Sequence, residues 1–295
     1  MKVLVTGGTG FIGTHLVDSL LERGHGVITL SRRPEGPPGV EHHSTDVRSD
    51  EATSVASRVD AIVHLAGLSN ASVSYQDPAL FSRVNALGTL AILEGARLGG
   101  ARVVLASSQR VYRPSLRPIP ESGLVEPQDP YAYSKLCAES WLEMYARFYG
   151  VCGITLRFFS VYGPGLVAAS GTSGVAGIFV ARALRGEPLA VHANQRRDLT
   201  YVSDVVQGIV LALEKPVAPG SCYNVATGIG TTMEELAELV RRLTRSRSRV
   251  VLETAESFGY LVADISKARA ELDFSPRVDL AEGLERYIAW FRANG

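Results

Sequence analysis

The sequence has no excess charge of either sign, since its 30 Lys and Arg residues equal its 30 Asp and Glu residues. This balance gives no reason to expect a nucleic acid or an acidic surface as a partner. Long hydrophobic runs are also missing: stretches such as Ala61–Leu68 are far shorter than the about 20 residues that cross a membrane. Val3–Val5 leads directly into a glycine-rich turn, which is not the layout of a signal peptide. The sequence therefore predicts a cytoplasmic protein that does not enter a membrane.

Cysteine is scarce as well, with three in 295 residues. Cys137, Cys152 and Cys222 are scattered along the chain and lack the spacing of metal ligands. We therefore expect buried free thiols and no metal site.

Alternating strand and helix patterns fill the chain up to about residue 160. A chain of 295 residues that is 46% hydrophobic can bury a full α/β core. The alternation predicts a Rossmann-type, doubly wound parallel sheet with helices on both faces. The candidate strands are Lys2–Thr6, Gly26–Ser31, Ala61–Ala66, Arg102–Ser107 and Gly153–Phe158, and the candidate helices are Phe11–Arg23, Asp77–Leu98 and Tyr131–Tyr149.

Gly7, Gly10 and Gly13 mark the turn from the first strand into the first helix. A sharp turn, a close approach of the backbone to a pyrophosphate and tight packing of the helix on the sheet each exclude a β-carbon. The free N–H groups and the positive dipole end of the helix would face the phosphates. We therefore predict a dinucleotide site here; the alternative is a turn with a purely structural role.

The pattern changes after Tyr162–Gly165. The segment Ala168–Gly177 is rich in Ala, Ser and Gly, which predicts a mobile loop over a pocket. Beyond it we expect a helix near Val175–Arg185, a return to the first domain around Leu199–Leu213, and helices at Thr232–Thr244 and Leu280–Ala293. These pieces are too few for a core of their own. We predict a dinucleotide-binding domain over residues 1–160, with a return segment at about 196–214, and a small C-terminal α/β substrate lobe over most of residues 161–295, with the substrate between them.

A second motif opens the helix over Tyr131–Tyr149. Tyr131 and Lys135 are four residues apart and share a helix face. The ammonium and a nicotinamide's positive charge can together favour the phenolate of a side chain whose ordinary pKa is about 10. Ser108 follows a strand, where side chains of an open α/β sheet meet a ligand crevice, so its hydroxyl can bond the reacting hydroxyl. We predict a catalytic group of three; the alternative is that Tyr131 and Lys135 cap a surface helix while Ser108 closes a turn.

Further motifs extend this order over nearly the whole chain, namely Asp46–Val47, His64–Gly67, Asn85–Thr89, Arg157–Pro164 and Arg197–Val202. With these motifs the chain resembles the extended short-chain dehydrogenase/reductases of the NAD-dependent epimerase/dehydratase family. The resemblance implies that Tyr131 is the acid/base, Lys135 binds the nicotinamide ribose and Ser108 polarises the substrate. It also implies hydride transfer between a sugar carbon and the nicotinamide C4.

The resemblance implies two sets of binding residues. Asp46 would touch the adenine, and the guanidinium of Arg197 would bind the diphosphate of a nucleotide sugar. The expected cofactor-binding residues are Gly7, Gly10, Phe11, Ile12, Gly13, Ser31, Arg32, Arg33, Asp46, Val47, Leu65, Ala66, Gly67, Asn85, Tyr131 and Lys135. The expected substrate-binding residues are Ser107, Ser108, Gln109, Ser160 and Arg197.

The end of the second strand departs from the pattern of NAD-preferring members. Those members carry an acidic residue that accepts both ribose hydroxyls, whereas Ser31, Arg32 and Arg33 stand here. Ser31 leaves room for a 2′-phosphate, and either arginine can pair with it. This departure favours NADP over NAD; the alternative is that both arginines are solvated loop residues.

Other departures concern the reaction and the substrate. Dehydratases of the family carry acidic residues directly after position 108, where this chain has Gln109 and Arg110, so we do not expect elimination of water. Ser160 replaces the usual asparagine, and Thr254–Ser257 stands where a second phosphate-binding arginine is expected. The substrate is therefore a nucleotide sugar or a smaller polyol or keto-sugar.

We predict an NAD(P)-dependent oxidoreductase of such a sugar. A 4-ketoreductase that uses NADPH once and releases it is favoured by Ser31 and the two arginines, and the alternative is a nucleotide-sugar 4-epimerase that retains NAD. A binding protein that senses NAD(P) without turnover is an alternative of another class. The intact Ser108, Tyr131 and Lys135 argue against it.

The helices over Asp77–Leu98 and Tyr131–Tyr149 are apolar on more than one face, which indicates packing against a second subunit. In similar proteins such helices pair as a four-helix bundle. We therefore expect a homodimer with Leu90, Leu93, Trp141 or Tyr145 in its interface.

Overall fold

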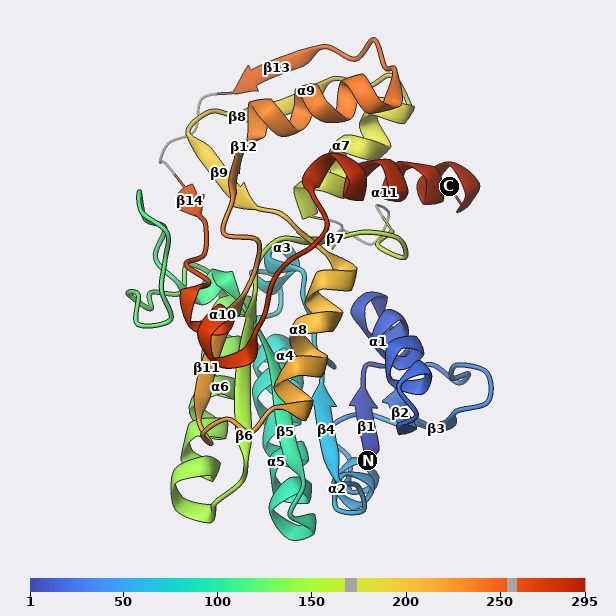
Figure 1. The fold of residues 1–295 in the computed structure, drawn as a ribbon, viewed down its shortest axis with the longest axis vertical. Helices are drawn as coiled ribbons and strands as arrows, with labels where there is room; N and C mark the ends of the chain where they lie inside the picture. The colour runs from blue at the N-terminus through green and yellow to red at the C-terminus, as the bar shows by residue number, and fades with distance from the viewer. Residues whose placement is uncertain (168–173, 254–258, 295) are drawn as a thin grey trace.

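A parallel sheet of seven strands is the centre of the described part of the chain (Figure 1). The computed structural model describes residues 1–167, 174–253 and 259–294. In their order across the sheet, the strands are β11 (Ser221–Val225), β6 (Gly153–Phe158), β5 (Arg102–Ser108), β4 (Ala61–His64), β1 (Lys2–Thr6), β2 (Gly26–Ser31) and β3 (Glu41–Ser44). The strand order reverses beside β1, between β1 and β4, and a ligand crevice is expected at such a point, outside the carboxyl ends of the strands.

The five strands expected from the sequence are confirmed, although β4 ends two residues earlier and β5 one residue later than predicted. The two edge strands were not predicted. In β3 the residues are polar and partly exposed, and β11 combines serine, cysteine, tyrosine and asparagine with valine. Neither strand therefore carries the apolar run that identified the central strands.

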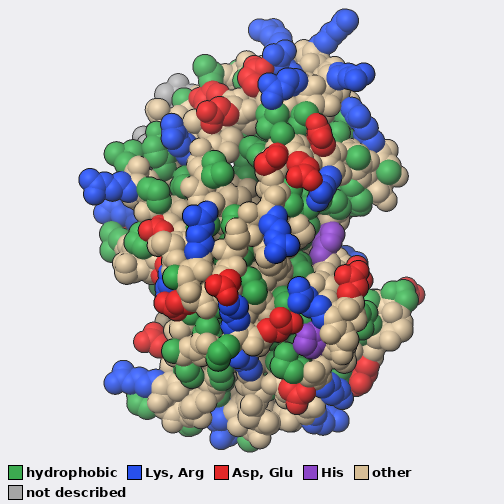
Figure 2. All heavy atoms as spheres, in the orientation of Figure 1, with side chains coloured by type: hydrophobic (Ala, Val, Ile, Leu, Met, Phe, Trp, Pro, Cys, Tyr) green, Lys and Arg blue, Asp and Glu red, His purple; other side chains and the backbone are tan. Residues whose placement is uncertain are grey.

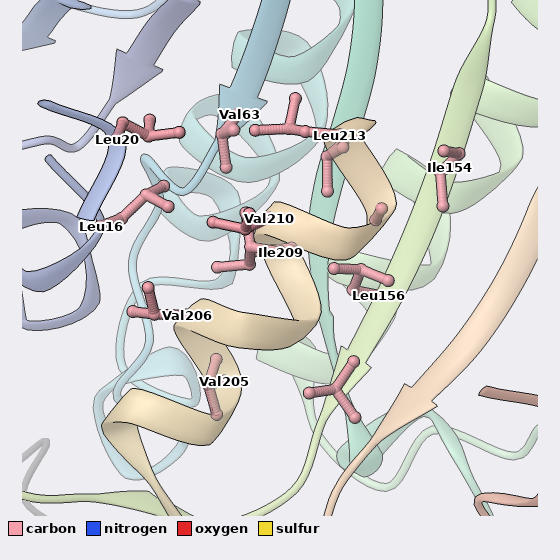
Figure 3. Packing of buried hydrophobic residues seen from close by; sticks show 14 of the residues in the cluster. Leu16, Leu20, Val63, Ile154, Leu156, Val205, Val206, Ile209, Val210 and Leu213 are labelled. Atoms are coloured by element: carbon pink, nitrogen blue, oxygen red, sulfur yellow. The ribbon is translucent and has the colours of Figure 1, made fainter. Parts of the chain in front are cut away.

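Helices cover both faces of the sheet. On one face lie α1 (Phe11–Glu22) and α8 (Val202–Glu214), and on the other lie α2 (Asp50–Ala56), α5 (Gly88–Gly99) and α6 (Pro130–Tyr149). Figure 3 shows apolar side chains of α8, among them Val206, Val210 and Leu213, packed against residues of α1 and of the sheet. Helix α8 therefore completes one face of the core.

The helix α6 begins and ends where its sequence signals predict. The carboxylate of Asp129 accepts a hydrogen bond from the Ala132 N–H (2.8 Å), and Pro130 occupies the first helical position. Gly150, with a φ of +70°, ends the helix in the left-handed conformation. The helix start is thus fixed immediately before Tyr131.

The single helix expected over Asp77–Leu98 is wrong in its detail. The structure has a short α4 (Pro78–Phe81), a π-helical segment (Ser82–Leu87) and then α5. A π-helical turn inserts an extra residue that the 3.6-residue periodicity does not reveal. The π-helical segment contains Asn85, whose buried side chain reaches across to Leu68 and Ser134.

The C-terminal elements gather above the carboxyl ends of the strands in Figure 1. The helices predicted there are confirmed as α7 (Gly174–Leu184), α9 (Met233–Thr244) and α11 (Leu280–Asn294), which share an apolar cluster. Short strands pair beside them: β7 (Val161–Tyr162) with β10 (Thr200–Tyr201), β8 (Leu189–His192) with β13 (Val250–Glu253), and β9 (Gln195–Asp198) with β12 (Gly230–Thr232) and β14 (Gly259–Leu261).

The return to the sheet is longer than expected. After α8, strand β11 pairs with β6, and the short helix α10 (Ser266–Leu272) contributes Ala268 and Leu272 to the cluster under α1 and α8. The chain therefore passes between the sheet and the C-terminal elements more than once, and the division into two domains stays a prediction.

Several expectations about single residues need correction. Cys137 is exposed, and Cys152 and Cys222 are half-buried, although all three thiols are free. Leu93 and Tyr145, expected in a dimer interface, are buried in the core of their own chain between α5, α6 and the sheet. Residues 168–173 of the expected loop, and Thr254–Ser257, lie outside the described residues.

The neutral overall charge conceals an uneven distribution. Figure 2 shows acidic and basic side chains interspersed over the lower part of the molecule, and Lys and Arg gathered at its upper end, over α9 and β13. The chain there carries exposed arginines at positions 241, 242, 245, 247 and 249. None of the helices in the described ranges combines the length and the apolarity that a membrane span needs.

Candidate active site

A cavity of about 850 Å³ lies along the carboxyl ends of the strands. Its wall includes the glycine turn, the ends of β2, β4 and β5, the first turn of α6, and residues of β7 and β9. The sequence predicted twenty-one binding or catalytic residues, and twenty of them line this one cavity. The exception is Asn85.

The glycine turn has the backbone that was expected of it. Gly7 has a φ of +73°, and a β-carbon there would lie 2.9 Å from the backbone nitrogen of Ala66. A β-carbon on Gly13 would lie only 2.2 Å from the carbonyl oxygen of Gly7. Gly10 caps α1 without a side-chain hydrogen bond, and the first turn of α1 carries no acidic residue. The first N–H groups of α1 are therefore free for an anionic ligand, so the turn fits the phosphates of a dinucleotide.

The far end of the cavity, beyond β2, is basic. Ser31, Arg32 and Arg33 line it together with Thr9, which the sequence analysis did not predict. The Thr9 hydroxyl donates a hydrogen bond to the Ser31 hydroxyl (2.9 Å), and the backbone N–H of Arg33 donates to the same oxygen (3.2 Å). Both arginine side chains are exposed, so their guanidinium groups are accessible to a ligand phosphate.

Asp46 is the acidic residue at this end, and it is already paired. Its carboxylate forms an ion pair with Arg48 (2.7 Å), which lowers the pKa of Asp46 below its ordinary value. Val47 beside it is buried. An adenine at this end would therefore meet a carboxylate whose charge Arg48 offsets.

Ser108, Tyr131 and Lys135 all line the cavity. Burial raises the pKa of the Tyr131 phenol above its ordinary value, and a hydrogen bond with Ser108 and the charge of Arg110 oppose that increase. The ammonium of Lys135 donates to the carbonyl oxygen of Ala106 (2.9 Å). Burial lowers the pKa of Lys135 to about 8. A proton acceptor, a hydroxyl partner and a cation thus share one buried location.

A buried ion pair contacts the end of β5. Arg157 on β6 donates two hydrogen bonds to Glu139 on α6, at 2.6 and 3.0 Å. Ser107 donates its hydroxyl to the same carboxylate, and the guanidinium of Arg157 stacks on the Tyr112 ring at 4.6 Å. Ser107 therefore lines the cavity with its hydroxyl proton donated to Glu139, so its predicted contact with substrate would use the hydroxyl oxygen as an acceptor.

The remaining predicted substrate residues, Gln109, Ser160 and Arg197, also line the cavity. The Gln109 amide donates to the Ser160 hydroxyl (2.9 Å), and among the described residues its Oε1 has no partner. Arg197 donates to the carbonyl oxygens of Gly259 and Arg196 and to the side chain of Gln195. No carboxylate of the described residues lies within ion-pair distance of Arg197, and burial together with the charge of Arg110 lowers its pKa to about 10. An anionic ligand would offset this charge.

Asn85 lies behind the wall instead of on it. Its side chain accepts a hydrogen bond from the Leu68 N–H (2.7 Å) and donates to the Leu68 carbonyl and to the Ser134 hydroxyl. Its buried amide makes these three hydrogen bonds, so Asn85 fixes the backbone of Leu68, and its predicted contact with the cofactor stays a prediction.

His64 is a buried polar residue that does not line the cavity. Its ring contacts the hydroxyls of Thr6 (2.7 Å) and Thr89 (3.0 Å). Burial and the charge of Lys135 lower the pKa of His64 to about 3. No group of three His, Cys, Asp or Glu side chains that could hold a metal ion occurs in residues 1–167, 174–253 and 259–294.

Comparison with known proteins identifies a family and several relatives that this chain resembles. The profile of the NAD dependent epimerase/dehydratase family matches residues 3–226. A putative UDP-glucose 4-epimerase from Methanocaldococcus jannaschii is 33% identical over 99% of both chains. UDP-glucuronic acid decarboxylase 1 from Arabidopsis thaliana is also 33% identical, over 99% of this chain and 70% of the relative.

A solved structure agrees with the sequence relatives. The crystal structure of a UDP-glucose 4-epimerase from Thermus thermophilus, in complex with NAD, superposes with a TM-score of 0.89 at 33% identity and covers 100% of each chain. The similarity therefore extends over the sheet and the C-terminal elements alike.

Proposed function

The chain belongs to the NAD-dependent epimerase/dehydratase family, and from this premise we propose that it oxidises or reduces C4 of a nucleotide-linked sugar. The proposal rests on one observation: Ser108, Tyr131 and Lys135 line the same cavity as the glycine turn. The names of its relatives support a UDP-linked hexose as the substrate. Arg197, whose charge no described carboxylate offsets, would take the diphosphate.

Each residue of the catalytic group has one task. Tyr131 takes a proton from the sugar hydroxyl in the direction of oxidation and returns it in reduction. Ser108 bonds the same hydroxyl and keeps it within reach of the phenol oxygen. Lys135, a cation at neutral pH, favours the phenolate and holds a ribose hydroxyl. A nicotinamide dinucleotide on the glycine turn would supply a hydride acceptor and donor at C4 of its ring.

The basic end of the cavity supports the reductive form of this reaction. Ser31 provides a small hydroxyl where a carboxylate would exclude a 2′-phosphate, and Arg32 and Arg33 are exposed beside it. We therefore propose NADP as the cofactor and 4-ketoreduction as the reaction. A 4-epimerase with retained NAD is the second candidate, and the relatives named as UDP-glucose 4-epimerases favour it.

The nucleotide that copurifies with the protein separates the two candidates. The freshly purified protein is denatured and any released nucleotide is identified; the cofactor-free protein is then titrated with NAD and with NADPH, and assayed with UDP-glucose and with its 4-keto form. Weak, exchangeable NADPH and reduction of the keto sugar support the ketoreductase. Stoichiometric NAD and interconversion of UDP-glucose and UDP-galactose support the epimerase. Binding without turnover of either sugar contradicts the proposal and supports a nucleotide sensor.

We also propose that the protein is a homodimer through α5 and α6. Leu93 and Tyr145 are committed to the chain's own core, but Leu90 and Trp141 are only half-buried. Large apolar side chains are exposed at the ends of the same helices, at Leu98 (61%), Phe148 (68%) and Tyr149 (57%). Apolar side chains exposed on neighbouring helices support a subunit contact.

A further inference from the structure

Arg110 follows the end of β5, and its side chain reaches the start of α6. It lies in the short 3₁₀ turn Gln109–Val111, directly after Ser108. Its Nε and Nη2 donate to one carboxylate oxygen of Asp129, at 2.7 and 2.6 Å. Its backbone N–H donates to the Ser108 hydroxyl oxygen (3.2 Å). One residue therefore contacts both the hydroxyl of Ser108 and the residue that precedes α6.

Asp129 uses its other carboxylate oxygen for the helix. This oxygen accepts the hydrogen bond from the Ala132 N–H that caps α6. The Asp129 side chain has no exposed surface, whereas that of Arg110 is 41% exposed and lines the cavity. The same carboxylate thus joins the strand-end segment that carries Ser108 to the first helical turn that carries Tyr131.

We propose that Arg110 is a positioning residue, whose ion pair with Asp129 fixes Ser108 and Tyr131 at the separation that proton transfer requires. The inference rests on the proposed function, because it assigns a role within that reaction. We name the Arg110–Asp129 pair, with its bonds to Ser108 and Ala132, the strand–helix clamp.

The need for such a clamp follows from the connection between the two elements. Between the 3₁₀ turn and α6, the chain runs from Tyr112 to Asp129 with two isolated bridges among the described residues, Tyr112 to Val125 and Ile119 to Ala263, and neither of them involves α6. A connection of this kind does not by itself hold two catalytic groups in register. Misplacing reacting groups by about 1 Å can cost about 100-fold in rate, so a short ion pair at this junction has a large effect on turnover.

The charges around the phenol agree with this role. Arg110, from the 3₁₀ turn, lowers the pKa of Tyr131, and Asp129, preceding the helix, raises it. Ser108 contributes a hydrogen bond from β5, and α4 contributes the uncharged ring of Phe81. Lys135, one turn along α6, donates to the carbonyl oxygen of Ala106. The two partners of the clamp therefore act on the phenol with opposite signs.

Three variants test the clamp: Arg110→Gln, Asp129→Asn and the double variant. Asparagine retains an oxygen that can cap α6, so Asp129→Asn removes the charge and keeps the helix start. Arg113→Gln is the matched control, because Arg113 lies on the same segment and its pair with Glu126 is exposed, at 3.7 Å. The readouts are kcat, KM, the pH profile of kcat, and hydrogen exchange of the first turn of α6.

We expect each single variant to lower kcat by about tenfold or more, while KM and cofactor affinity change less than about twofold. The double variant should be no worse than the worse single variant, since the same contact is lost. In the pH profile of kcat, the apparent pKa that belongs to Tyr131 should rise in Arg110→Gln and fall in Asp129→Asn. Exchange of the first turn of α6 should be faster in both, and unchanged in Arg113→Gln.

Two results would overturn the inference. One is a wild-type kcat and wild-type exchange in Arg110→Gln. The other is a loss of kcat that follows a loss of thermal stability, with an unmoved pH profile, since a purely structural pair would give that. If the wild-type protein turns over no nucleotide sugar, the proposed function fails, and the exchange comparison still tests whether the clamp holds α6.

Discussion

Glu139 and Arg157 form an ion pair in which both side chains are more than nine-tenths buried, at 9% and 8% exposure respectively. The pair joins α6 to β6 directly beneath the end of β5, and the Ser107 hydroxyl completes it. The residue after Ser107 is the catalytic candidate Ser108. The proposed catalytic residue Ser108 therefore follows a residue that is bound to a buried ion pair, and this pair is stable only when both charged side chains are present.

Replacing one partner of this pair should destabilise the protein strongly. In Arg157→Gln the carboxylate of Glu139 would stay buried without its counter-charge, which costs about 3–5 kcal/mol in the free energy of unfolding. Urea unfolding followed by circular dichroism measures this. Arg185→Gln is the control, since its pair with Glu187 is about half exposed and should contribute less than about 1 kcal/mol. Equal losses in the two variants would contradict the argument.

Tyr131→Phe should abolish turnover while the protein still binds its dinucleotide. Loss of a general acid/base lowers the rate by about 10²–10⁴-fold, and the ring that packs edge-on against Phe81 is retained. Single-turnover kinetics and a cofactor titration measure the two properties. Tyr133→Phe, on an exposed position of the same helix (58%), should leave both unchanged. A biological activity that survives Tyr131→Phe would favour the nucleotide sensor.

Ser31→Asp should move the cofactor preference from NADP toward NAD. A carboxylate at this position would accept the ribose hydroxyls of NAD and repel a 2′-phosphate. We expect the affinity for NADPH to fall by about tenfold or more, and the affinity for NAD to rise. Ser44→Asp, on the neighbouring strand β3 and outside the cavity, controls for the added charge. An unchanged ratio of the two dissociation constants would show that Ser31 does not determine the preference between NADP and NAD.

Stability should fall as the pH falls below about 6.5, in part because of His64. The ordinary pKa of the ring is 6.5, but in the folded protein burial lowers it to about 3. Between these values the unfolded chain binds a proton that the folded chain does not, so the free energy of unfolding decreases with falling pH, by at most about 1.4 kcal/mol per pH unit. Urea unfolding between pH 4.5 and 7.5 should give a shallower slope for His64→Gln than for the wild type. Identical slopes would remove His64 from the explanation.

The proposed dimer predicts twice the chain mass in light scattering at micromolar concentration. Leu98→Glu should yield monomers, because it places a charge on the exposed apolar end of α5. Leu252→Glu, equally exposed (65%) but on β13, should remain dimeric. A wild-type protein that is monomeric under these conditions would contradict the contact through α5 and α6.

The parts of the site that the sequence predicted are those whose signal is local. The glycine turn, and the pair Tyr131 and Lys135, are each read within a few residues, because helix and turn geometry fix how such close neighbours face. Central strands such as β1 and β6 were predicted to the residue, since β1 contains the apolar run Val3–Val5 and β6 alternates the apolar Ile154, Leu156 and Phe158 with polar residues.

The parts that it did not predict depend on tertiary structure. Arg110 and Asp129 are 19 residues apart, and Glu139 and Arg157 are 18 apart, so no periodicity joins them. Polar edge strands such as β3 give no apolar run, and the π-helical segment at Asn85 interrupts a helix that hydrophobic spacing describes as continuous. Sequence reasoning thus found the residues of the site, but not the contacts that support them.

The spacing around the glycine turn also decides which variants can report on ligand affinity. A methyl group on Gly13 would collide with the Gly7 carbonyl at 2.2 Å, and this collision exists whether or not a nucleotide is present. A methyl group on Gly10 would lie 3.1 Å from the same oxygen and meets no other atom within 4 Å. Gly13→Ala therefore disrupts folding, whereas Gly10→Ala requires the Gly7 carbonyl to shift by only a few tenths of an ångström. A binding defect can be attributed to the phosphate contact only in the second variant.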